Sequence, residues 1–378
     1  MFESKNRFLT HMRNDLCRKK KESLCVDKVS SNLACTGHGS RHNCTNVGAK
    51  HGAQSVHPFT LVESYLQTVT KSIKEDLRAV DSELLDVSEY YFDGQGKLFR
   101  PMLVMLMAKA VNFHTNQMDR LLSSQEKIAV IAEMIHTASL MHDDVIDAAD
   151  SRRGKPSINQ VFGHRKSILG GDFVMAMASI ALARIRDEEV VSVVAQITED
   201  LVRGEFMQLG SKEKEDERFT HYLNKSFKKT ASLLANSCKA VAILSHCDEG
   251  IEEIAYDYGK NVGISFQLID DLLDFTSCDL VMGKPTAADL RLGLATAPVL
   301  FAAKKFPELN AMIMRRFSEK GDVETARELV AQSDGIEQTR QLAHEHSAEA
   351  VRQIRTLTES RYVTGLEMLA NIVLSRKK

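Results

Sequence analysis

The chain has 378 residues, 43% of them hydrophobic, and its 49 Lys and Arg nearly balance its 51 Asp and Glu. This length and composition provide a sizeable core in one large or two ordinary domains. The longest uncharged apolar stretch, near 174–183, is shorter than the roughly 20 residues that span a bilayer, so we expect no transmembrane anchor. We also expect no nucleic-acid partner.

Residues 1–57 differ in composition from the rest of the chain. They hold ten Lys and Arg against four Asp and Glu, a net charge of +6, with clustered Ser, Asn, Gly and His. A basic, acid-poor segment without a continuous apolar core is typical of a mitochondrial presequence rather than a secretory signal. Because four acidic residues are present, a disordered cytosolic extension remains the alternative. We therefore predict a mitochondrial protein, in the matrix or at the periphery of the inner membrane, with one domain over 58–378.

Apolar residues recur at intervals of three and four from residue 58 onward, β-branched alternation is scarce, and the chain has only six prolines. This pattern predicts a single all-α domain. Residues 151–156 are expected to form a loop, and Pro101 to open a helix. The remaining helices are predicted at 60–90, 122–149, 167–187, 189–210, 216–245, 250–277, 289–305 and, with breaks, 321–376.

Two acidic clusters stand about 120 positions apart in apolar helical contexts: Asp143, Asp144 and Asp147, then Asp270, Asp271 and Asp274. In a helix the first and last aspartate of each cluster share a face and repel each other, so a cation must compensate them. If the two helices face each other, six carboxylates converge on one cavity. Hard oxygen ligands suit Mg²⁺, which is commonly shared with substrate phosphates. A charged helix surface is the alternative for either cluster alone.

Basic residues occur in or beside breaks near these clusters or at helix ends: Lys97, Arg100, Arg152, Arg153, Lys229 and Lys284. Arginine binds phosphate oxygens through a two-pronged fork, and lysine supplies a point charge. Taken singly, each is more often a surface charge. His136 is two helical turns before Asp143 and projects on nearly the same face, although a core histidine with a backbone partner is the alternative.

In chain order these residues form a more specific pattern. Gly96-Lys97-Leu98-Phe99-Arg100-Pro101, the first cluster followed by Ser151-Arg152-Arg153-Gly154, Lys229-Thr230 and the second cluster preceded by Phe266-Gln267 resemble the trans-isoprenyl diphosphate synthases. The resemblance covers about 58–378 and is strongest to long-chain members that serve ubiquinone synthesis. It implies an all-α fold, a single large helical bundle around a central apolar cavity, and Mg²⁺ as the cofactor.

The resemblance also implies the roles of the site residues. Isopentenyl diphosphate would bind at Lys97, Arg100, His136 and Arg153. The allylic substrate, farnesyl or geranylgeranyl diphosphate, would bind at Arg152, Lys229, Thr230, Gln267 and Lys284. All six aspartates would be catalytic, with Mg²⁺ held by Asp143, Asp147 and Asp270. The sequence departs from the family pattern at Gln95, where a glycine is usual, and at Leu294, where many relatives carry a second lysine.

Product length should depend on the helix face below the first cluster. Ala138 and Ser139 stand five and four residues before Asp143, and neither is large enough to form a floor. A helical turn rises about 5.4 Å, comparable to one isoprene unit, so an aromatic residue here would stop growth early. We predict a long product, of about ten units by the resemblance; hexaprenyl and solanesyl synthases are the shorter-chain alternatives.

The resemblance implies a hetero-oligomer with a second, homologous subunit that lacks most motifs; a homodimer is the alternative. It leaves open peripheral contact with a membrane for product release. A catalytically inactive or regulatory subunit would not need to keep all six aspartates. A class I terpene cyclase would normally replace the second aspartate cluster with an Asn/Ser/Glu-type motif, and would not need Lys97 and Arg100 for a second diphosphate. Both alternatives are therefore disfavoured.

Overall fold

The computed structural model describes residues 57–78, 82–94, 96–210, 214–276 and 287–376. Almost all regular structure in these ranges is helical, which confirms the predicted all-α class. The predicted presequence, apart from His57, lies outside the described residues, as do Gln95 and Lys284.

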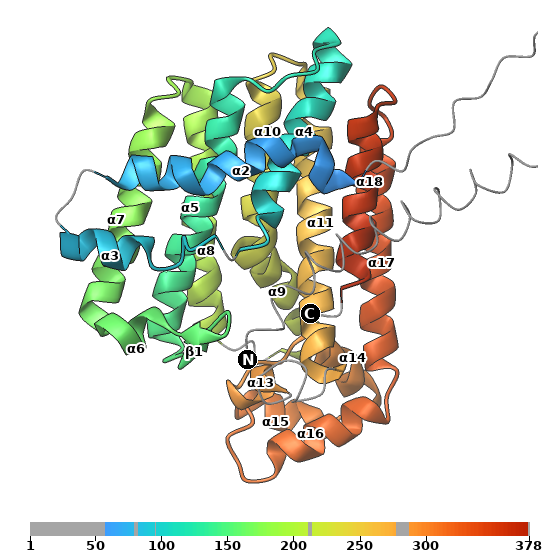
Figure 1. Cartoon of the computed structure of the whole chain (residues 1–378). Helices are drawn as coiled ribbons and strands as arrows, with labels where there is room; N and C mark the ends of the chain where they lie inside the picture. Colours follow the sequence, from blue (N-terminus) through green and yellow to red (C-terminus); the bar gives the residue numbers. More distant parts are fainter. Residues whose placement is uncertain (1–56, 79–81, 95, 211–213, 277–286, 377–378) are drawn as a thin grey trace, which may run out of the picture. The chain divides into compact units, whose positions relative to one another are not determined.

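Figure 1 labels the helices and strands of the bundle and colours them in chain order. The first half of the described chain contains α2 (Pro58–Leu77), α3 (Ser82–Glu89), α4 (Phe99–Asn116), α5 (Ser123–Ile146), β1 (Ser151–Arg152), β2 (Lys155–Pro156), α6 (Ile158–Phe162), α7 (His164–Ala183) and α8 (Glu188–Leu209). The second half contains α9 (Glu215–Ser226), the π-helix η1 (Phe227–Ala231), α10 (Ser232–Ile243), α11 (Glu249–Thr276), α13 (Ala288–Arg291), α14 (Ala297–Lys305), α15 (Leu309–Met314), α16 (Asp322–Ala331), α17 (Gly335–Ile354) and α18 (Arg361–Leu374).

The loop predicted at 151–156 is instead a short antiparallel hairpin, in which Ser151 pairs with Pro156 and Arg152 with Lys155. Its two turn residues, Arg153 and Gly154, have φ of 54° and 77°. Positive φ at both positions is the geometry of tight hairpin turns, whose twist matches that of the strands. A non-glycine residue held in this conformation is uncommon, so the hairpin fixes Arg153 in an unusual backbone state.

Other boundaries also differ from the sequence prediction. The helix predicted at 60–90 appears as α2 and α3, and the one predicted at 289–305 as α13 and α14. α4 begins at Phe99, two residues before Pro101, because proline is tolerated anywhere in the first turn, where its missing N–H has no helical acceptor. The helix predicted at 216–245 is divided into α9, η1 and α10. A π-turn widens the helix by one residue per turn and is frequently found at functional sites.

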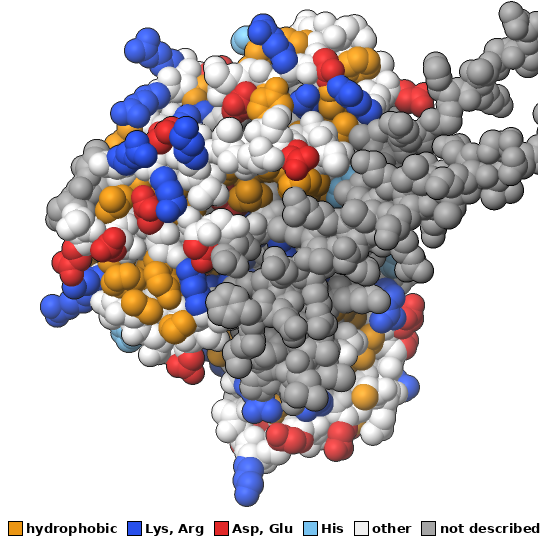
Figure 2. All heavy atoms as spheres, in the orientation of Figure 1, with side chains coloured by type: hydrophobic (Ala, Val, Ile, Leu, Met, Phe, Trp, Pro, Cys, Tyr) orange, Lys and Arg blue, Asp and Glu red, His pale blue; other side chains and the backbone are white. Residues whose placement is uncertain are grey.

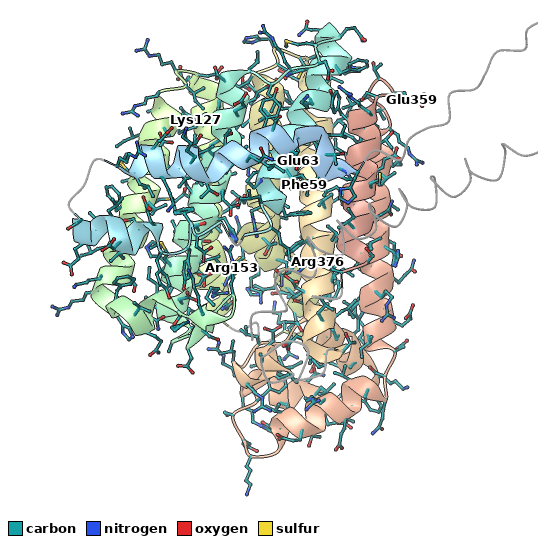
Figure 3. All side chains as sticks on the ribbon, viewed as in Figure 1. Phe59, Glu63, Lys127, Arg153, Glu359 and Arg376 are labelled. Carbon is teal, nitrogen blue, oxygen red and sulfur yellow. The ribbon has the colours of Figure 1, made fainter. Side chains whose placement is uncertain are left out.

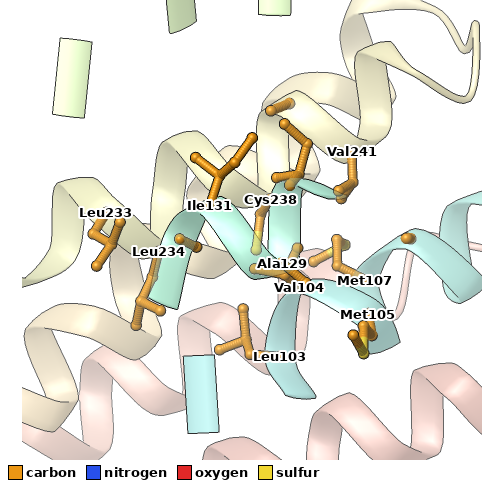
Figure 4. Packing of buried hydrophobic residues seen from close by; sticks show 14 of the residues in the cluster. Leu103, Val104, Met105, Met107, Ala129, Ile131, Leu233, Leu234, Cys238 and Val241 are labelled. Atoms are coloured by element: carbon orange, nitrogen blue, oxygen red, sulfur yellow. The ribbon is translucent and has the colours of Figure 1, made fainter. Parts of the chain in front are cut away.

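The main apolar core lies where α4, α5 and α10 meet (Figure 4). Leu103 and Val104 of α4, Ile131 of α5, and Leu234 and Cys238 of α10 are all almost completely buried. α4 and α10 bury residues on nearly every side, as expected for helices that are apolar all round. α10 packs against α4, α5, α8 and α11, so both aspartate-bearing helices, α5 and α11, rest on it.

The carboxyl-terminal helices complete the bundle around α11. α11 packs most extensively against α17 and α10, and α18 packs against α17, α4 and α2. A separate apolar cluster joins α13, α14, α15 and α16 through Leu290, Val299, Leu309 and Val330. On the face shown in Figure 2, basic and acidic side chains are interspersed, in line with the net charge of −2.

One helix in the described ranges, α7, is long and apolar enough by length and composition to cross a membrane. The sequence analysis counted only uncharged stretches, whereas α7 also includes Arg165, Lys166 and Asp172; the absence of a transmembrane anchor stays a prediction. It packs against α5, α3 and α6, and core helices of a bundle meet the same criterion.

Candidate active site

The first acidic cluster ends α5 and divides into two kinds of aspartate. Asp144 is completely buried and accepts hydrogen bonds from the Tyr91 hydroxyl and from Arg152, whose Nε and Nη2 lie 2.8 and 2.6 Å from its Oδ1. Asp144 therefore fixes Arg152 of the hairpin. The carboxylates of Asp143 and Asp147 make no hydrogen bond to any residue that the structure describes. Both are close enough to Lys229 and Glu205 to interact with their charges.

The pKa of Asp143 is raised to about 7, mainly by burial and also by the charges of Glu205 and Asp147, against the opposing charges of Lys229 and Arg152. The pKa of Asp147 is raised by burial and by Glu205 as well. The carboxylates of Asp143, Asp147 and Glu205 thus repel one another, and the positive charges of Lys229 and Arg152 do not fully offset this repulsion. Glu205 was not predicted from the sequence, because it lies on α8 and no local spacing connects it with α5.

The second cluster, near the end of α11, repeats this division. Asp271 is buried and accepts from the Tyr222 hydroxyl and from Gln267 at 2.8 Å. Gln267 in turn accepts from the Thr230 hydroxyl at 2.7 Å. Asp274 accepts the backbone N–H groups of Ala288 and Asp289 at 3.0 and 3.2 Å and so anchors the start of α13.

Asp270, the first aspartate of this cluster, binds the end of the chain. Arg376 donates to its Oδ1 at 2.8 Å, and the Arg376 guanidinium lies 3.9 Å from the centroid of the Phe266 ring. Burial raises the pKa of Asp270, while Arg376, Arg100 and Lys97 lower it. Arg376 was not predicted, since it follows the last helix by two residues and belongs to no motif.

Asp289 adds a further carboxylate to the second cluster. Its pKa is raised to about 8, mainly by burial and also by the charges of Asp271 and Asp274. The acidic group is therefore larger than the three aspartates read from the sequence. A clue was available, because Asp289 opens the helix predicted at 289–305, the next one after the second cluster.

Three of the four residues predicted to bind isopentenyl diphosphate are brought together. Arg100, His136 and Arg153 act on one another electrostatically, and the buried Glu133 lies among them. The positive charge of Lys97, like that of Arg100, lowers the pKa of Asp270. Burial lowers the pKa of Arg100 to about 10. Burial and the neighbouring arginines hold the pKa of His136 well below its usual value, so its imidazole is neutral at neutral pH.

Arg100 connects this group to the chain terminus, because it faces both Arg153 and Arg376, two residues labelled near the middle of the view in Figure 3. The Arg100 Nε and Arg376 Nη1 atoms are buried without a hydrogen-bond partner in the part of the chain that the structure describes. Unsatisfied buried donors are costly and call for an explanation. A bound anion would satisfy both.

Three of the residues predicted for the allylic substrate lie on η1 or on α11, which packs against it: Lys229, Thr230 and Gln267. Lys229 donates to Gln208 at 2.9 Å and pairs with Glu205 at 2.5 Å, both on α8. Lys228, the preceding residue, is bound to the buried Asp200 at 2.5 Å. Thr230 joins Gln267 and thereby Asp271. The π-helix thus directs adjacent side chains to the two acidic clusters, with Lys229 at the first and Thr230 at the second.

The donor set fits a divalent cation. Asp143 and Asp147 are hard oxygen ligands one helical turn apart, and their raised pKa values show that their charges are not fully compensated by the protein. Within the described ranges no three Asp, Glu, His or Cys side chains form a ready-made metal site. Of the six aspartates, Asp144, Asp270, Asp271 and Asp274 are bound to protein groups, and the convergence of all six carboxylates on one cavity stays a prediction.

The predicted chain-length residues lie on α5. Ala138 is completely buried, and so are Ile131, Met134 and Ile135 one to two turns earlier, all below 4% exposure. Ser139 is half-buried and donates to the His136 carbonyl at 2.9 Å. Neither side chain is bulky. This face of α5 is therefore lined by small and flexible apolar groups.

Comparison with known proteins agrees with this geometry. The family model described as polyprenyl synthetase matches residues 81–330. The all trans-polyprenyl-diphosphate synthase of Homo sapiens is 57% identical over 338 residues, which cover 89% of this chain and 81% of that protein. The decaprenyl-diphosphate synthase subunit 1 of Schizosaccharomyces pombe is 43% identical and covers 89% and 94% of the two chains.

Solved structures agree as well. The polyprenyl synthase of Caulobacter crescentus CB15, complexed with calcium and isoprenyl diphosphate, has a TM-score of 0.76 and 28% identity over 87% of this chain and 100% of its own. A decaprenyl diphosphate synthase from Rhodobacter capsulatus has a TM-score of 0.75 and 26% identity, covering 85% and 98%. The family match, the relatives and the shared fold lead to one conclusion: the chain belongs to the polyprenyl synthetase family and is a prenyltransferase.

Proposed function

We propose that the chain elongates an allylic diphosphate, farnesyl or geranylgeranyl, with successive isopentenyl diphosphate units to an all-trans product of about ten units for ubiquinone synthesis. One observation carries this proposal: the cations form two groups. The guanidinium groups of Arg100 and Arg153 lie together beside the neutral His136, while Arg152 and Lys229 lie at the first acidic cluster. Two diphosphates need two such groups, whereas a cyclase acting on one diphosphate needs one.

In this proposal the first group holds the diphosphate of isopentenyl diphosphate, and the second group, with Thr230, Gln267 and Lys284, holds the allylic diphosphate. The allylic C–O bond breaks, diphosphate leaves, and an allylic cation forms. The double bond of isopentenyl diphosphate attacks that cation, and one proton is then lost, which the released diphosphate accepts. Arg152 and Lys229 stabilise the leaving group because they are held in place before the bond breaks, by Asp144 on one side and by Gln208 and Glu205 on the other.

Asp143, Asp147 and Asp270 would hold Mg²⁺. When bound, the ion supplies positive charge to the diphosphate as it leaves. Asp144, Asp271 and Asp274 support the site through the hydrogen bonds that they accept. The crystal structure from Caulobacter crescentus, complexed with calcium and isoprenyl diphosphate, supports divalent-cation and isoprenoid-diphosphate binding in a related site.

The long product follows from the absence of a bulky residue at Ala138 and Ser139, and from relatives named decaprenyl-diphosphate synthases. Relatives named hexaprenyl and solanesyl synthases are 40% and 39% identical, so a shorter product is the second candidate. Several of these relatives are named mitochondrial, which supports a mitochondrial location and the assignment of residues 1–57 as a presequence preceding one domain over 58–378.

The name of the fission-yeast relative, subunit 1, supports an assembly with a second, homologous subunit, and a homodimer is the alternative. A purely regulatory role is disfavoured because both cation groups and all six aspartates are present. Release of the apolar product would bring the protein to a membrane surface.

The test is incubation of the purified chain with Mg²⁺, labelled isopentenyl diphosphate and farnesyl or geranylgeranyl diphosphate, with products separated by size. Products of eight to ten units would establish a self-sufficient long-chain synthase. Elongation that appears only after a homologous subunit is added would establish an obligatory partner. A folded chain that binds neither diphosphate would refute the proposal.

A further inference from the structure

A small cavity of about 80 Å³ lies next to residues that bind Lys229 and next to residues that bind the second acidic cluster. Its lining includes Gln208 of α8, and Tyr222 and Lys225 of α9. Gln208 accepts a hydrogen bond from Lys229, and Tyr222 donates one to Asp271. The cavity is therefore in direct contact with the partners of a predicted diphosphate ligand and of the second acidic cluster.

Lys225 differs from the two lysines that follow it. Lys228 is bound to Asp200, and Lys229 to Glu205 and Gln208. The Lys225 ammonium makes neither a hydrogen bond nor an ion pair with any described residue; its Nζ lies 5.9 Å from the centroid of the Tyr222 ring. The carboxylates of Asp271, Asp289 and Glu205 surround it at longer range.

The burial of this ammonium is not offset by a direct partner. Burial lowers the pKa of Lys225 and so does the charge of Lys229, while the charges of Asp271, Asp289 and Glu205 oppose this effect without a direct ion pair. An unpaired cation removed from water is costly, and an anion in the cavity would relieve that cost. Lys225 and Lys229 are four residues apart, so the two side chains project from the same side of the α9–η1 segment.

Leu294 lines the same cavity, at the position where the sequence departs from the family pattern. It contributes an apolar side chain, and Arg316, another lining residue, contacts the Gln208 carbonyl oxygen at 3.5 Å. Lys225 is thus a cation lining this cavity whose ammonium makes no hydrogen bond or ion pair with any described residue.

We propose that Lys225 binds a diphosphate oxygen of the allylic substrate and supplies, from α9, the positive charge that Leu294 cannot supply. This inference rests on the proposed function for the identity of the substrate. It does not require turnover, because the ligand class is a diphosphate anion.

The experiment compares the wild type with Lys225→Met, Lys225→Arg, Leu294→Lys and the double variant Lys225→Met with Leu294→Lys. Lys214→Met is the matched control, because Lys214 stands at the start of α9 and pairs with the exposed Glu217. Two quantities are measured for each protein: the affinity for inorganic diphosphate in the presence of Mg²⁺, by calorimetry, and the separate KM values for farnesyl and isopentenyl diphosphates. Melting curves check that each variant is folded.

Loss of a charged hydrogen bond predicts that Lys225→Met weakens diphosphate binding and raises the KM for farnesyl diphosphate by about tenfold. The KM for isopentenyl diphosphate should change by less than about twofold. Lys225→Arg and Lys214→Met should resemble the wild type. In the double variant, the lysine at 294 should restore most of the lost affinity, a rescue that a merely structural role for Lys225 would not produce.

Equal diphosphate affinity of wild type and folded Lys225→Met would overturn the inference, even if elongation is normal. If Lys225→Met does not fold, Leu294→Lys alone decides: stronger diphosphate binding supports an anion in this cavity, and unchanged binding overturns it. If no protein elongates but Lys225→Met still loses diphosphate affinity, the proposed function fails while the binding role of Lys225 stands.

Discussion

At the scale of single residues, the two acidic clusters use their adjacent aspartates in the same way. The second aspartate of each cluster, Asp144 and Asp271, is buried and accepts from a tyrosine hydroxyl, of Tyr91 and Tyr222 respectively. Adjacent residues of a helix project about 100° apart. When the second aspartate turns into the protein, the first, Asp143 or Asp270, is left on the side that faces a ligand.

The raised pKa of Asp143 predicts that its ionised carboxylate lowers the stability of the metal-free protein at alkaline pH. Its pKa is raised from 3.8 to about 7, so the native state binds more protons than the unfolded state between these values. Stability therefore falls as the pH rises through this window. In a metal chelator at pH 8, Asp143→Asn should melt several degrees above the wild type, and the gap should shrink at pH 5.5, where the wild-type carboxyl is protonated.

Asp86→Asn, a change at an exposed position of α3, is the control and should leave the melting temperature unchanged at both pH values. A gap between Asp143→Asn and wild type that is the same at pH 8 and pH 5.5 would contradict the assigned titration. Differential scanning calorimetry measures the melting temperature of each protein at the two pH values.

Local spacing was sufficient to place some of these residues and not others. The interval of seven residues placed His136 near the first cluster's face, and the interval of four placed Asp143 beside Asp147. Tyr91, Glu205 and Arg376 could not be found in this way, because each reaches the site from a segment far away in sequence. Only the packing of α5, α8 and α11 on their neighbours brings such residues together.

At the scale of elements, the π-helix η1 decides how lysines reach the site. The N–H of Ser232 donates to the carbonyl of Phe227, five residues earlier, and Ser232 also donates through its hydroxyl to Asp200 at 2.6 Å. Asp200 binds Lys228 as well. One buried carboxylate therefore holds the turn at both of its ends, while Lys229 and Thr230 between them point to the acidic clusters.

Close approach of α8 to η1 depends on Gly204. A Cβ at this position would lie 2.6 Å from Lys229 Cγ and 3.2 Å from the Lys229 backbone nitrogen, so the two elements would have to separate. Gly204→Ala should lower the melting temperature by several degrees and raise the KM for the allylic diphosphate about tenfold by misplacing Lys229.

Gly210→Ala is the matched control on the same helix end, since a Cβ there would meet nothing closer than 4.0 Å. Thermal melts and initial-rate kinetics distinguish the two variants. Normal kinetics and stability in Gly204→Ala would show that the contact between α8 and η1 is not needed to place Lys229.

The elements themselves were largely predictable. Apolar periodicity placed α5, α8 and α11 to within a few residues, because each has a continuous buried stripe. The break inside 216–245 was not visible, since a π-turn changes hydrogen bonding without requiring glycine or proline. The hairpin at 151–156 was also missed, because strands of two residues show no alternation.

At the scale of the whole molecule, the end of the chain returns to the site through α18. Arg376 is 16% exposed at its side chain and contacts both Asp270 and Phe266. Removing this cation leaves the partly buried Asp270 with less compensation. Arg376→Met should therefore lower the melting temperature at pH 8 by several degrees, and the loss should be smaller at pH 4, where Asp270, whose pKa burial raises, is increasingly protonated.

Arg355→Met is the control, because Arg355 forms an exposed pair with Glu367 between α17 and α18, and such pairs contribute little. Melting curves at the two pH values make the comparison. An equal loss at pH 8 and pH 4, or none at pH 8, would show that the pairing of Arg376 with Asp270 does not support the fold.

The position of Arg376 has a consequence for how a gene encoding this chain tolerates change. A stop codon or frameshift that removes only the last three residues leaves the whole family match, which ends at 330, intact, yet deletes the cation bound to Asp270. Such an allele would be judged harmless by domain content alone and should nevertheless impair the protein. During translation, too, the pairing of Asp270 with Arg376 cannot form before the codon for residue 376 has been read.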